Sequence, residues 1–328
     1  MSSFLSPKLQ SLNAYVPGEQ PRDKKYIKLN TNESPYPPAP AVLSALSGTA
    51  LENLRLYPDP TCRALKEKLA AEYEVNPENV FVCNGSDEAL FFVFSAFCNG
   101  GVIFPEISYG FYKVFADLCG VPYSQIPLKD DFKLDISDYL GKNKTVVISN
   151  PNAPTGTCLS LAQIEEIVCT NPGNVVLIDE AYIDFGGQSC AALTKKYKNL
   201  MSVQTFSKSR SLAGGRLGFA IADKELIADL ELIKYSTNPY NIDRLTQLIG
   251  IAVLSDRAYF DSCREKIILT REKTKSALVE RGFTVTNSKA NFLFCRSDKI
   301  SGQKLYEKLR ERGILVRHFS NTLTCDWV

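Results

Sequence analysis

The feature that most constrains this chain is a repeated order of segments: a short apolar run, a polar turn, and a stretch with helical spacing. It occurs in NVFVCNG before SDEALFFVFSAF, in GVIFPEISYG before FYKVFADLCG, and in TVVISNPNAPTG before SLAQIEEIVC. NVVLIDEAYIDF and LMSVQTFSKS are further strand-like runs. Continuous β-branched runs that alternate with helices are typical of a parallel sheet covered on both faces. We therefore predict an α/β fold with a mostly parallel sheet flanked by helices.

Changes in composition and in the pattern of apolar segments divide the chain into three parts. Residues 1–40 are rich in proline and polar residues and are predicted to form an extended N-terminal arm. Residues 41–240 carry the strand–helix pattern and are predicted to form a large ligand-binding domain. Residues 241–328 contain a long amphipathic stretch with many charges, residues 256–282, followed by FTVTNS, NFLFCR, SGQKLYEKLRERG and ILVRHF. This order of a helix followed by strands predicts a smaller α+β domain.

Two helix starts are predicted from their capping residues. Thr61 precedes the amphipathic stretch RALKEKLAAEY and is expected to cap it. Ser160 and Gln163 have the spacing of a capping box.

Composition argues against several classes of function. The formal net charge of +2 gives no electrostatic reason to expect binding to nucleic acid or to a membrane surface. The longest apolar run, residues 89–97, is far shorter than the ~18 residues of a membrane span. The first residues, MSSFLSP, lack the pattern of a secretory signal. The ten cysteines form no C-x-x-C pair, which favours free thiols and a cytoplasmic location.

The chain contains a single histidine, His318. A metal site with several histidines is therefore impossible, and no metal is expected. A Ser-His-Asp or Cys-His mechanism would depend on this one residue. If the protein is an enzyme, we expect another group to carry protons at neutral pH.

Two polar turns follow predicted strands, and in a doubly wound sheet ligands bind beyond the carboxyl ends of the strands. Gly85, Ser86 and Asp87 follow the run FVC and open a helix. The free N–H groups of such a helix start can hold a phosphate, although the same residues also suit an ordinary capped turn. Asn152 lies in NPNAPTG, where its amide either meets a ligand oxygen or orders the loop.

Charged residues follow two further strands. Asp179 comes directly after VVLI, so it is expected near the core, facing a cation that is either a side chain or a protonated heterocycle. Lys208 comes after MSVQTFS and is either a solvated lysine or a partly desolvated nucleophile. Arg216 lies among glycines, and its guanidinium can donate two parallel N–H groups to a phosphate. A Ser207–Lys208 hydrolase pair is a weaker reading, because no oxyanion motif accompanies it.

Together these residues suit one ligand. It has a phosphate, a protonatable ring nitrogen, a ring oxygen, and an aldehyde that captures a lysine. These are the features of pyridoxal 5'-phosphate.

The motifs also resemble a known family. KLNTNESPY, LRLYPDP, NGSDEAL, SNPNAPTG, IDEAYIDF, TFSKSRSLAGGRLGF, ANFLF and GILVRHF follow one another in the order found in fold-type-I pyridoxal-phosphate-dependent aminotransferases. Within that superfamily the chain is similar to the histidinol-phosphate aminotransferases. The resemblance implies a large domain with a seven-stranded sheet.

The resemblance also implies roles for individual residues. Lys208 would bond the cofactor aldehyde, and Asp179 would keep the ring nitrogen protonated. The remaining cofactor contacts would come from Asn152 and Tyr182 at the ring oxygen, Tyr109 on the ring face, and Gly85, Ser86, Asp87, Thr205, Ser207 and Arg216 at the phosphate. Tyr57 would reach the cofactor phosphate of a neighbouring subunit, which implies a homodimer. Substrate would be bound by Tyr26, Asn32, Tyr36 and Arg317.

The reaction implied by the resemblance transfers the amino group of L-histidinol phosphate to 2-oxoglutarate, giving imidazole-acetol phosphate and L-glutamate in histidine biosynthesis. Once substrate displaces it, Lys208 would carry the proton, which fits a chain with one histidine. Two related activities share the same cofactor site: an aromatic aminotransferase and a decarboxylase of a phosphorylated amino acid.

The pattern departs from the family after Arg317. The family continues into a segment like DYLRITVG, whose arginine binds the carboxylate of the amino donor, whereas this chain reads HFSNTLTCDWV. One reading is a truncated or frame-altered chain with an incomplete small domain, and the other is an unusual active variant. The first is favoured, and it raises the alternative of a remnant that binds the cofactor without turnover.

Overall fold

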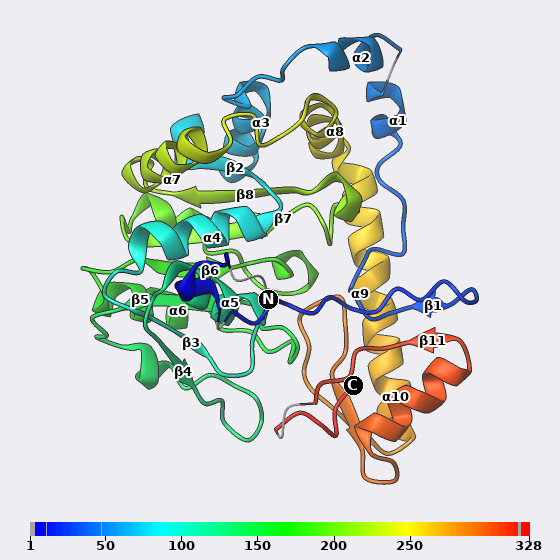
Figure 1. Cartoon of the computed structure of the whole chain (residues 1–328). Coiled ribbons are helices and arrows are strands. Elements are labelled where there is room, and N and C mark those ends of the chain that lie inside the picture. Colours follow the sequence, from blue (N-terminus) through cyan, green and yellow to red (C-terminus); the bar gives the residue numbers. More distant parts are fainter. Residues whose placement is uncertain (1–3, 11, 47, 321–322) are drawn as a thin grey trace.

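A computed structural model describes residues 4–10, 12–46, 48–320 and 323–328 (Figure 1). Its centre is a seven-stranded sheet with the strand order β2-β8-β7-β6-β5-β3-β4. The strands are β2 (Val80–Asn84), β3 (Val102–Pro105), β4 (Tyr123–Ile126), β5 (Thr145–Ser149), β6 (Val176–Asp179), β7 (Leu200–Thr205) and β8 (Leu217–Ala222). Only β8 runs against its neighbours, β2 and β7. The predicted mostly parallel seven-stranded sheet is confirmed.

Alternate residues of the strands point to opposite faces of the sheet, and both faces are covered. In β5, Val147 joins the core cluster on one face, while Val146 and Ile148 join the cluster on the other. The helices of this part are α3 (Arg63–Tyr73), α4 (Ser86–Phe97), α5 (Phe111–Cys119), α6 (Leu161–Thr170) and α7 (Lys224–Thr237). This double covering explains why the strands read as continuous apolar runs.

One of the two predicted helix caps is correct. The Ser160 hydroxyl accepts from the Gln163 N–H, and the reciprocal bond completes the capping box of α6. The prediction for Thr61 is wrong, because α3 begins at Arg63 and its first N–H donates to the Asp59 carboxylate at 2.9 Å. Thr61 donates its hydroxyl to the same carboxylate at 2.7 Å. A charged acceptor has replaced the hydroxyl as the capping group.

The remaining elements form the top and one side of the molecule in Figure 1. They are α1 (Ala41–Ala45), α2 (Gly48–Glu52), α8 (Arg244–Ser255), α9 (Arg257–Glu280), β9 (Phe283–Val285), β10 (Cys295–Ser297), α10 (Gly302–Glu311) and β11 (Ile314–Leu315). The arm residues Ile27–Lys28 form β1, which pairs in parallel with β11. The arm is therefore anchored to the C-terminal part of the chain.

The C-terminal residues pack against the body of the protein. The Trp327 ring stacks on Phe294 with 4.8 Å between centroids and meets Phe132 edge-on at 4.9 Å. Val328 and Cys295 exchange two backbone hydrogen bonds of 2.9 Å. Within the described ranges, no helix combines the length and apolar character needed to cross a bilayer.

Candidate active site

The predicted site residues meet at one edge of the sheet. Strands β2, β5, β6 and β7 all end there, and β8 begins there because it runs in the opposite direction. The register places Ser149 opposite Asp179, and Thr205 opposite Gly218. The turns that carry Gly85, Asn152 and Lys208 therefore leave the sheet at the same edge.

Asp179 is a buried carboxylate at the end of β6, with 3% of its surface exposed. It accepts hydrogen bonds from the Tyr112 hydroxyl at 2.7 Å and from the Ala181 N–H at 3.2 Å. Burial raises the pKa of Asp179 to about 6, against the lowering effect of these two bonds and with a smaller raising effect from nearby Asp87 and Glu180. No ion pair of Asp179 occurs among the described residues. The carboxylate has hydrogen bonds but lacks the cation expected beside it.

A helix start and an arginine form a candidate phosphate site. Gly85 has a φ of +69°, which glycine adopts freely, and it turns the chain from β2 into α4. A Cβ on Gly218 would lie 2.5 Å from the backbone nitrogen of Ser86, so only glycine fits there. Arg216, with 48% of its side chain exposed, pairs with Asp87 at 3.2 Å. First-turn N–H groups beside a half-exposed guanidinium suit a phosphate.

Lys208 lies in a turn beyond β7 that the Leu212 N–H closes by donating to the Phe206 carbonyl at 2.9 Å. Its partly buried amine donates to the Thr31 carbonyl of the arm at 3.0 Å. The same amine lies 5.7 Å from the centroid of the Tyr182 ring. The structure thus brings together the lysine and the tyrosine that the sequence suggested.

The arm crosses the site next to Tyr182. The Asn32 side chain donates to the Tyr182 hydroxyl at 3.2 Å, and the Asn32 carbonyl accepts from Asn291 at 3.0 Å. The structure therefore places Asn32 next to Tyr182, and its role in substrate binding stays a prediction. Asn291, which the sequence analysis did not single out, fixes this part of the arm.

Asn152 is fully buried, and its side chain is occupied by partners within the protein. Its amide nitrogen donates to the Ile107 carbonyl and to the Thr155 hydroxyl, both at 2.9 Å. Its oxygen accepts from the Ser108 hydroxyl at 2.8 Å. Asn152 therefore orders its loop in this conformation, and donation to a ligand oxygen would require the exchange of one of these partners.

Aromatic rings form one wall of the site. The Tyr109 hydroxyl donates to Asp87 at 2.8 Å, and burial raises the pKa of Tyr109 above its usual value. Tyr15 of the arm stacks on Phe111 at 4.2 Å and lies 6.1 Å from Tyr109. Burial raises the pKa of Tyr15, and the positive charge of Arg317 opposes that rise. The Arg317 guanidinium donates to the carbonyl of Val16, the residue after Tyr15, at 3.1 Å.

The other predicted residues take varied positions. Ser207 and Thr205 are buried at the sheet edge, where the Ser207 N–H donates to the Thr205 hydroxyl at 3.1 Å. Tyr57 is 76% exposed and stacks on Tyr240 at 4.5 Å. The hydroxyl of Tyr26 donates to Asp23, and the Tyr36 ring lies under Lys266.

The sequence analysis missed Tyr112, Ser108 and Tyr15. Tyr112 lies in the first turn of α5, three residues after Tyr109, so its nearness in sequence to a predicted site residue was a detectable signal. Ser108 and Tyr15 had none, because their contacts join segments that are distant in the sequence.

The side chains present fit pyridoxal phosphate. A protonated ring nitrogen would give Asp179 its missing cation, and the Gly85–Arg216 region would receive the phosphate. The Lys208 amine lies on the same edge of the sheet, as a bond to the aldehyde requires. The described part of the chain holds no cluster of three or more metal-binding side chains.

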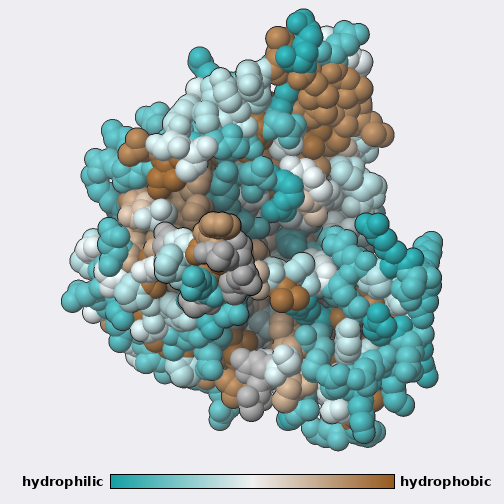
Figure 2. Space-filling view, viewed as in Figure 1, coloured by the Kyte–Doolittle hydropathy of each residue, from teal (hydrophilic) through white to brown (hydrophobic). Residues whose placement is uncertain are grey.

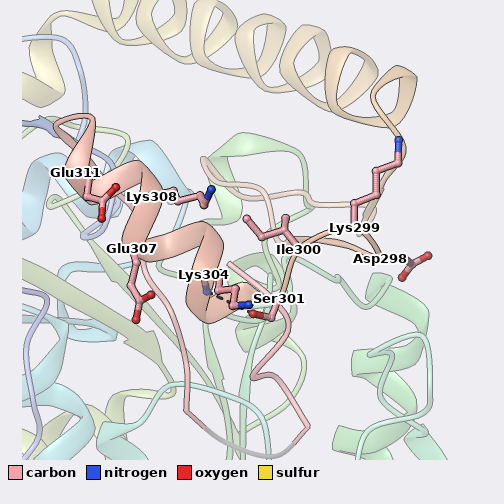
Figure 3. A pocket seen from close by; sticks show the side chains of 8 residues that line it. All are labelled: Asp298, Lys299, Ile300, Ser301, Lys304, Glu307, Lys308 and Glu311. Carbon is pink, nitrogen blue, oxygen red and sulfur yellow. Dashed lines mark hydrogen bonds between the residues drawn. The ribbon is translucent and has the colours of Figure 1, made fainter.

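A second hollow lies elsewhere and does not suit a specific ligand. Figure 3 shows it against α10, with a volume of about 650 Å³. It is lined by Asp298, Lys299, Ile300, Ser301, Lys304, Glu307, Lys308 and Glu311. Glu307 and Lys308 point in different directions (Figure 3), so their charges do not converge on one point. We place the functional site at the strand ends because the buried polar groups gather there.

Sequence comparison shows what the chain is similar to. The family described as "Aminotransferase class I and II" matches residues 24–328. The histidinol-phosphate aminotransferase of Brachyspira hyodysenteriae is 53% identical, over 100% of this chain and 94% of that protein. The histidinol-phosphate aminotransferase of Chromohalobacter salexigens is 49% identical, with the same coverage of both chains.

Solved structures share the fold. The crystal structure of the histidinol-phosphate aminotransferase from Clostridium acetobutylicum superposes with a TM-score of 0.86, at 26% identity over 92% of each chain. The structure of the Sinorhizobium meliloti histidinol-phosphate aminotransferase in complex with pyridoxal-5'-phosphate has a TM-score of 0.88, at 22% identity over 100% of this chain and 92% of that one.

The sheet order and the lysine, aspartate and helix start at its edge define a fold-type-I transferase with a site for a phosphorylated aldehyde cofactor. The chain belongs to the class I and II aminotransferases, the pyridoxal-phosphate-dependent enzymes that the motifs resemble.

Proposed function

We propose that this protein transfers the amino group of L-histidinol phosphate to 2-oxoglutarate, giving imidazole-acetol phosphate and L-glutamate. The observation that carries the reaction type is the buried Asp179 carboxylate, which has no paired cation among the residues that the structure describes and shares a sheet edge with Lys208. The substrate is proposed from the relatives, which are about half identical over the whole chain and carry this activity in their names. The reaction belongs to histidine biosynthesis, and we propose that it takes place in the cytoplasm.

Pyridoxal phosphate, when bound, supplies an aldehyde that captures amines and a protonated ring that withdraws electrons from the substrate carbon. Asp179 would hold the proton on the ring nitrogen, since its burial makes a neighbouring positive charge favourable. The Ser86 and Asp87 N–H groups and the Arg216 guanidinium would hold the phosphate, with Thr205 and Ser207 beside them.

Lys208 is the proposed proton carrier. Its amine would take the proton from the substrate Cα and deliver it to the aldehyde carbon of the cofactor. The Tyr182 ring, 5.7 Å away, and the Thr31 carbonyl, at 3.0 Å, hold the amine at this position. His318 has no part in this scheme, because its ring nitrogen bonds the Cys325 carbonyl at 2.8 Å.

Substrate binding is proposed at the mouth of the site. Arg317, which donates to the carbonyl of Val16, would pair with the substrate phosphate, and the adjacent Tyr15 would add a hydroxyl. Asn32 would orient the arm over the substrate through Tyr182. We also propose that Tyr26 and Tyr36 of the arm contact the substrate.

We propose a homodimer as the functional unit. Figure 2 shows apolar side chains gathered over the part of the molecule that carries α1 and α8 in Figure 1. The exposed apolar residues of the segment from α1 to the following loop include Leu43, Leu51, Leu54, Leu56 and Tyr57. A patch of this kind favours association, and Tyr57 within it would extend to the partner's cofactor phosphate.

The test uses purified protein loaded with pyridoxal phosphate. L-Histidinol phosphate should convert the bound cofactor to its amine form and release imidazole-acetol phosphate, and 2-oxoglutarate should then restore the aldehyde form and release glutamate. Measuring the two half-reactions separately distinguishes an active enzyme from a remnant that only binds cofactor. If L-histidinol phosphate leaves the bound cofactor unchanged and a phosphorylated amino acid, supplied separately, releases CO₂, the decarboxylase alternative replaces the proposal.

A further inference from the structure

A buried arginine lies two residues beyond Lys208. The Arg210 side chain is only 3% exposed. Its guanidinium lies against two aromatic rings, 5.2 Å from the centroid of Phe206 and 5.0 Å from that of Phe260. A buried cation requires paired acceptors, so its partners must be anionic or strongly polar.

The two carboxylate partners of Arg210 come from different parts of the fold. One nitrogen of the guanidinium donates to Glu72 of α3 at 2.8 Å, and the other donates to Asp184 at 3.1 Å. The Ser209 hydroxyl also donates to Asp184. Asp184 thus binds two consecutive residues of the turn that carries Lys208.

Asp184 lies two residues beyond Tyr182, in the short helical turn Ile183–Phe185. The Arg210–Asp184 pair therefore joins the two turns that present Lys208 and Tyr182 to the site. The pair is nearly buried, with 3% and 22% of the two side chains exposed, so solvent screens it only weakly. The Glu72 pair is equally shielded but connects the Lys208 turn to α3, away from Tyr182.

We propose that Arg210 and Asp184 are positioning residues that fix the distance between the Lys208 amine and the Tyr182 ring. This inference rests on the proposed function, since it assigns the Arg210–Asp184 pair a role in the capture of pyridoxal phosphate by Lys208. Neither residue touches the reacting atoms. Their effect passes through the two turns that they hold together.

The structure provides a matched pair of variants. Asp184→Asn and Glu72→Gln each neutralise one carboxylate partner of Arg210 and preserve its shape, but only the first loosens the connection to the Tyr182 turn. The apoprotein of each is mixed with pyridoxal phosphate, and the rate of covalent capture is followed by visible absorbance and by borohydride fixation to Lys208. Far-UV circular dichroism and the Tm are measured on the same samples.

We expect Asp184→Asn to slow capture and lower kcat by roughly tenfold, with KM changed less, because small misplacements of reacting groups carry large rate penalties. Glu72→Gln should stay within about twofold of wild type in both rates, even where it lowers the Tm as much. Equal effects of the two variants on capture would overturn the proposal and leave a purely structural pair. If Asp184→Asn does not fold, Asp184→Glu takes its place. A capture rate equal to that of wild type would then refute the positioning role of the Arg210–Asp184 pair.

The wild-type control separates this inference from the proposed function. If wild-type protein is not fixed to pyridoxal phosphate by borohydride, the proposed function fails before the variants are compared. If wild type is fixed and the variants do not differ, only the positioning role is lost.

Discussion

Replacing Asp179 by asparagine should remove a pH-dependent destabilisation of the cofactor-free protein. The pKa of Asp179 is about 6 in the folded chain, against an ordinary 3.8. At about 1.4 kcal/mol for each pH unit, the buried charge costs the folded state about 3 kcal/mol when it is fully ionised. Only 3% of the Asp179 surface is exposed, so solvent screens the buried charge very little.

The sign of the effect follows from proton binding. Between pH 3.8 and about 6 the folded protein holds a proton that the unfolded chain has released, so wild-type stability falls as pH rises through this window. Below the window Asp179 is neutral in both states, and above it the full cost persists. The free energy of unfolding of Asp179→Asn, minus that of wild type, should therefore rise by about 2 kcal/mol between pH 4 and 6, rise by a few tenths of a kcal/mol more up to about pH 7, and then stay constant.

The assay is urea unfolding of cofactor-free protein from pH 4 to 8, at one protein concentration because association would add its own stability. The new NH₂ group replaces a carboxylate oxygen that accepts a hydrogen bond, and the loss of that bond costs about 1–3 kcal/mol at every pH, so the change with pH is the informative quantity. As a control, Tyr112→Phe removes a hydrogen bond that lowers the pKa of Asp179, and it should extend the upper end of the window to higher pH while the lower end stays at 3.8. A stability difference that stays flat from pH 4 to 8 would refute the reasoning.

Three further predictions concern the site. Lys208→Ala should still bind pyridoxal phosphate but should lose borohydride-stable attachment, as read by mass spectrometry; attachment at the original position would contradict the assignment. Gly218→Ala should weaken cofactor affinity by more than about tenfold in calorimetric titration, because the new Cβ would meet the Ser86 backbone at 2.5 Å. Gly214→Ala, which meets no atom within 4 Å, is its matched control. Arg317→Gln should raise KM for histidinol phosphate by roughly 10–100-fold and leave unphosphorylated histidinol unaffected; equal effects on both substrates would exclude a phosphate contact.

The order of segments along the chain was sufficient to predict the sheet and the edge where ligands bind. Parallel strands separated by helices must end on the same side, so Asp179 and Lys208 could be assigned to one edge before any contact was known. The capping box at Ser160 was equally readable, because its two partners are three residues apart. The division at residues 40 and 240 stays a prediction.

Local pattern was insufficient where charge or distance decided the outcome. Asp59 displaced the expected Thr61 cap, because a carboxylate two residues earlier reaches the same N–H group. The reversed direction of β8 brings Arg216 to Gly85, which lies 131 residues earlier in the chain. Hydrophobic periodicity does not encode the direction of a strand within its sheet.

The sequence by itself therefore determined the class of fold, the chemistry of the candidate residues and the family, since these depend on residue types in a fixed order. Only the tertiary structure decided which groups satisfy one another. Tyr112 bonds Asp179 across 67 residues, and Asn32 of the arm bonds Tyr182 across 150. The hydrogen bonds of Arg210 to Asp184 and Glu72 depend in the same way on elements brought together by packing. Burial sets the strength of these contacts, and burial exists only once the sheet, the helices and the arm have assembled.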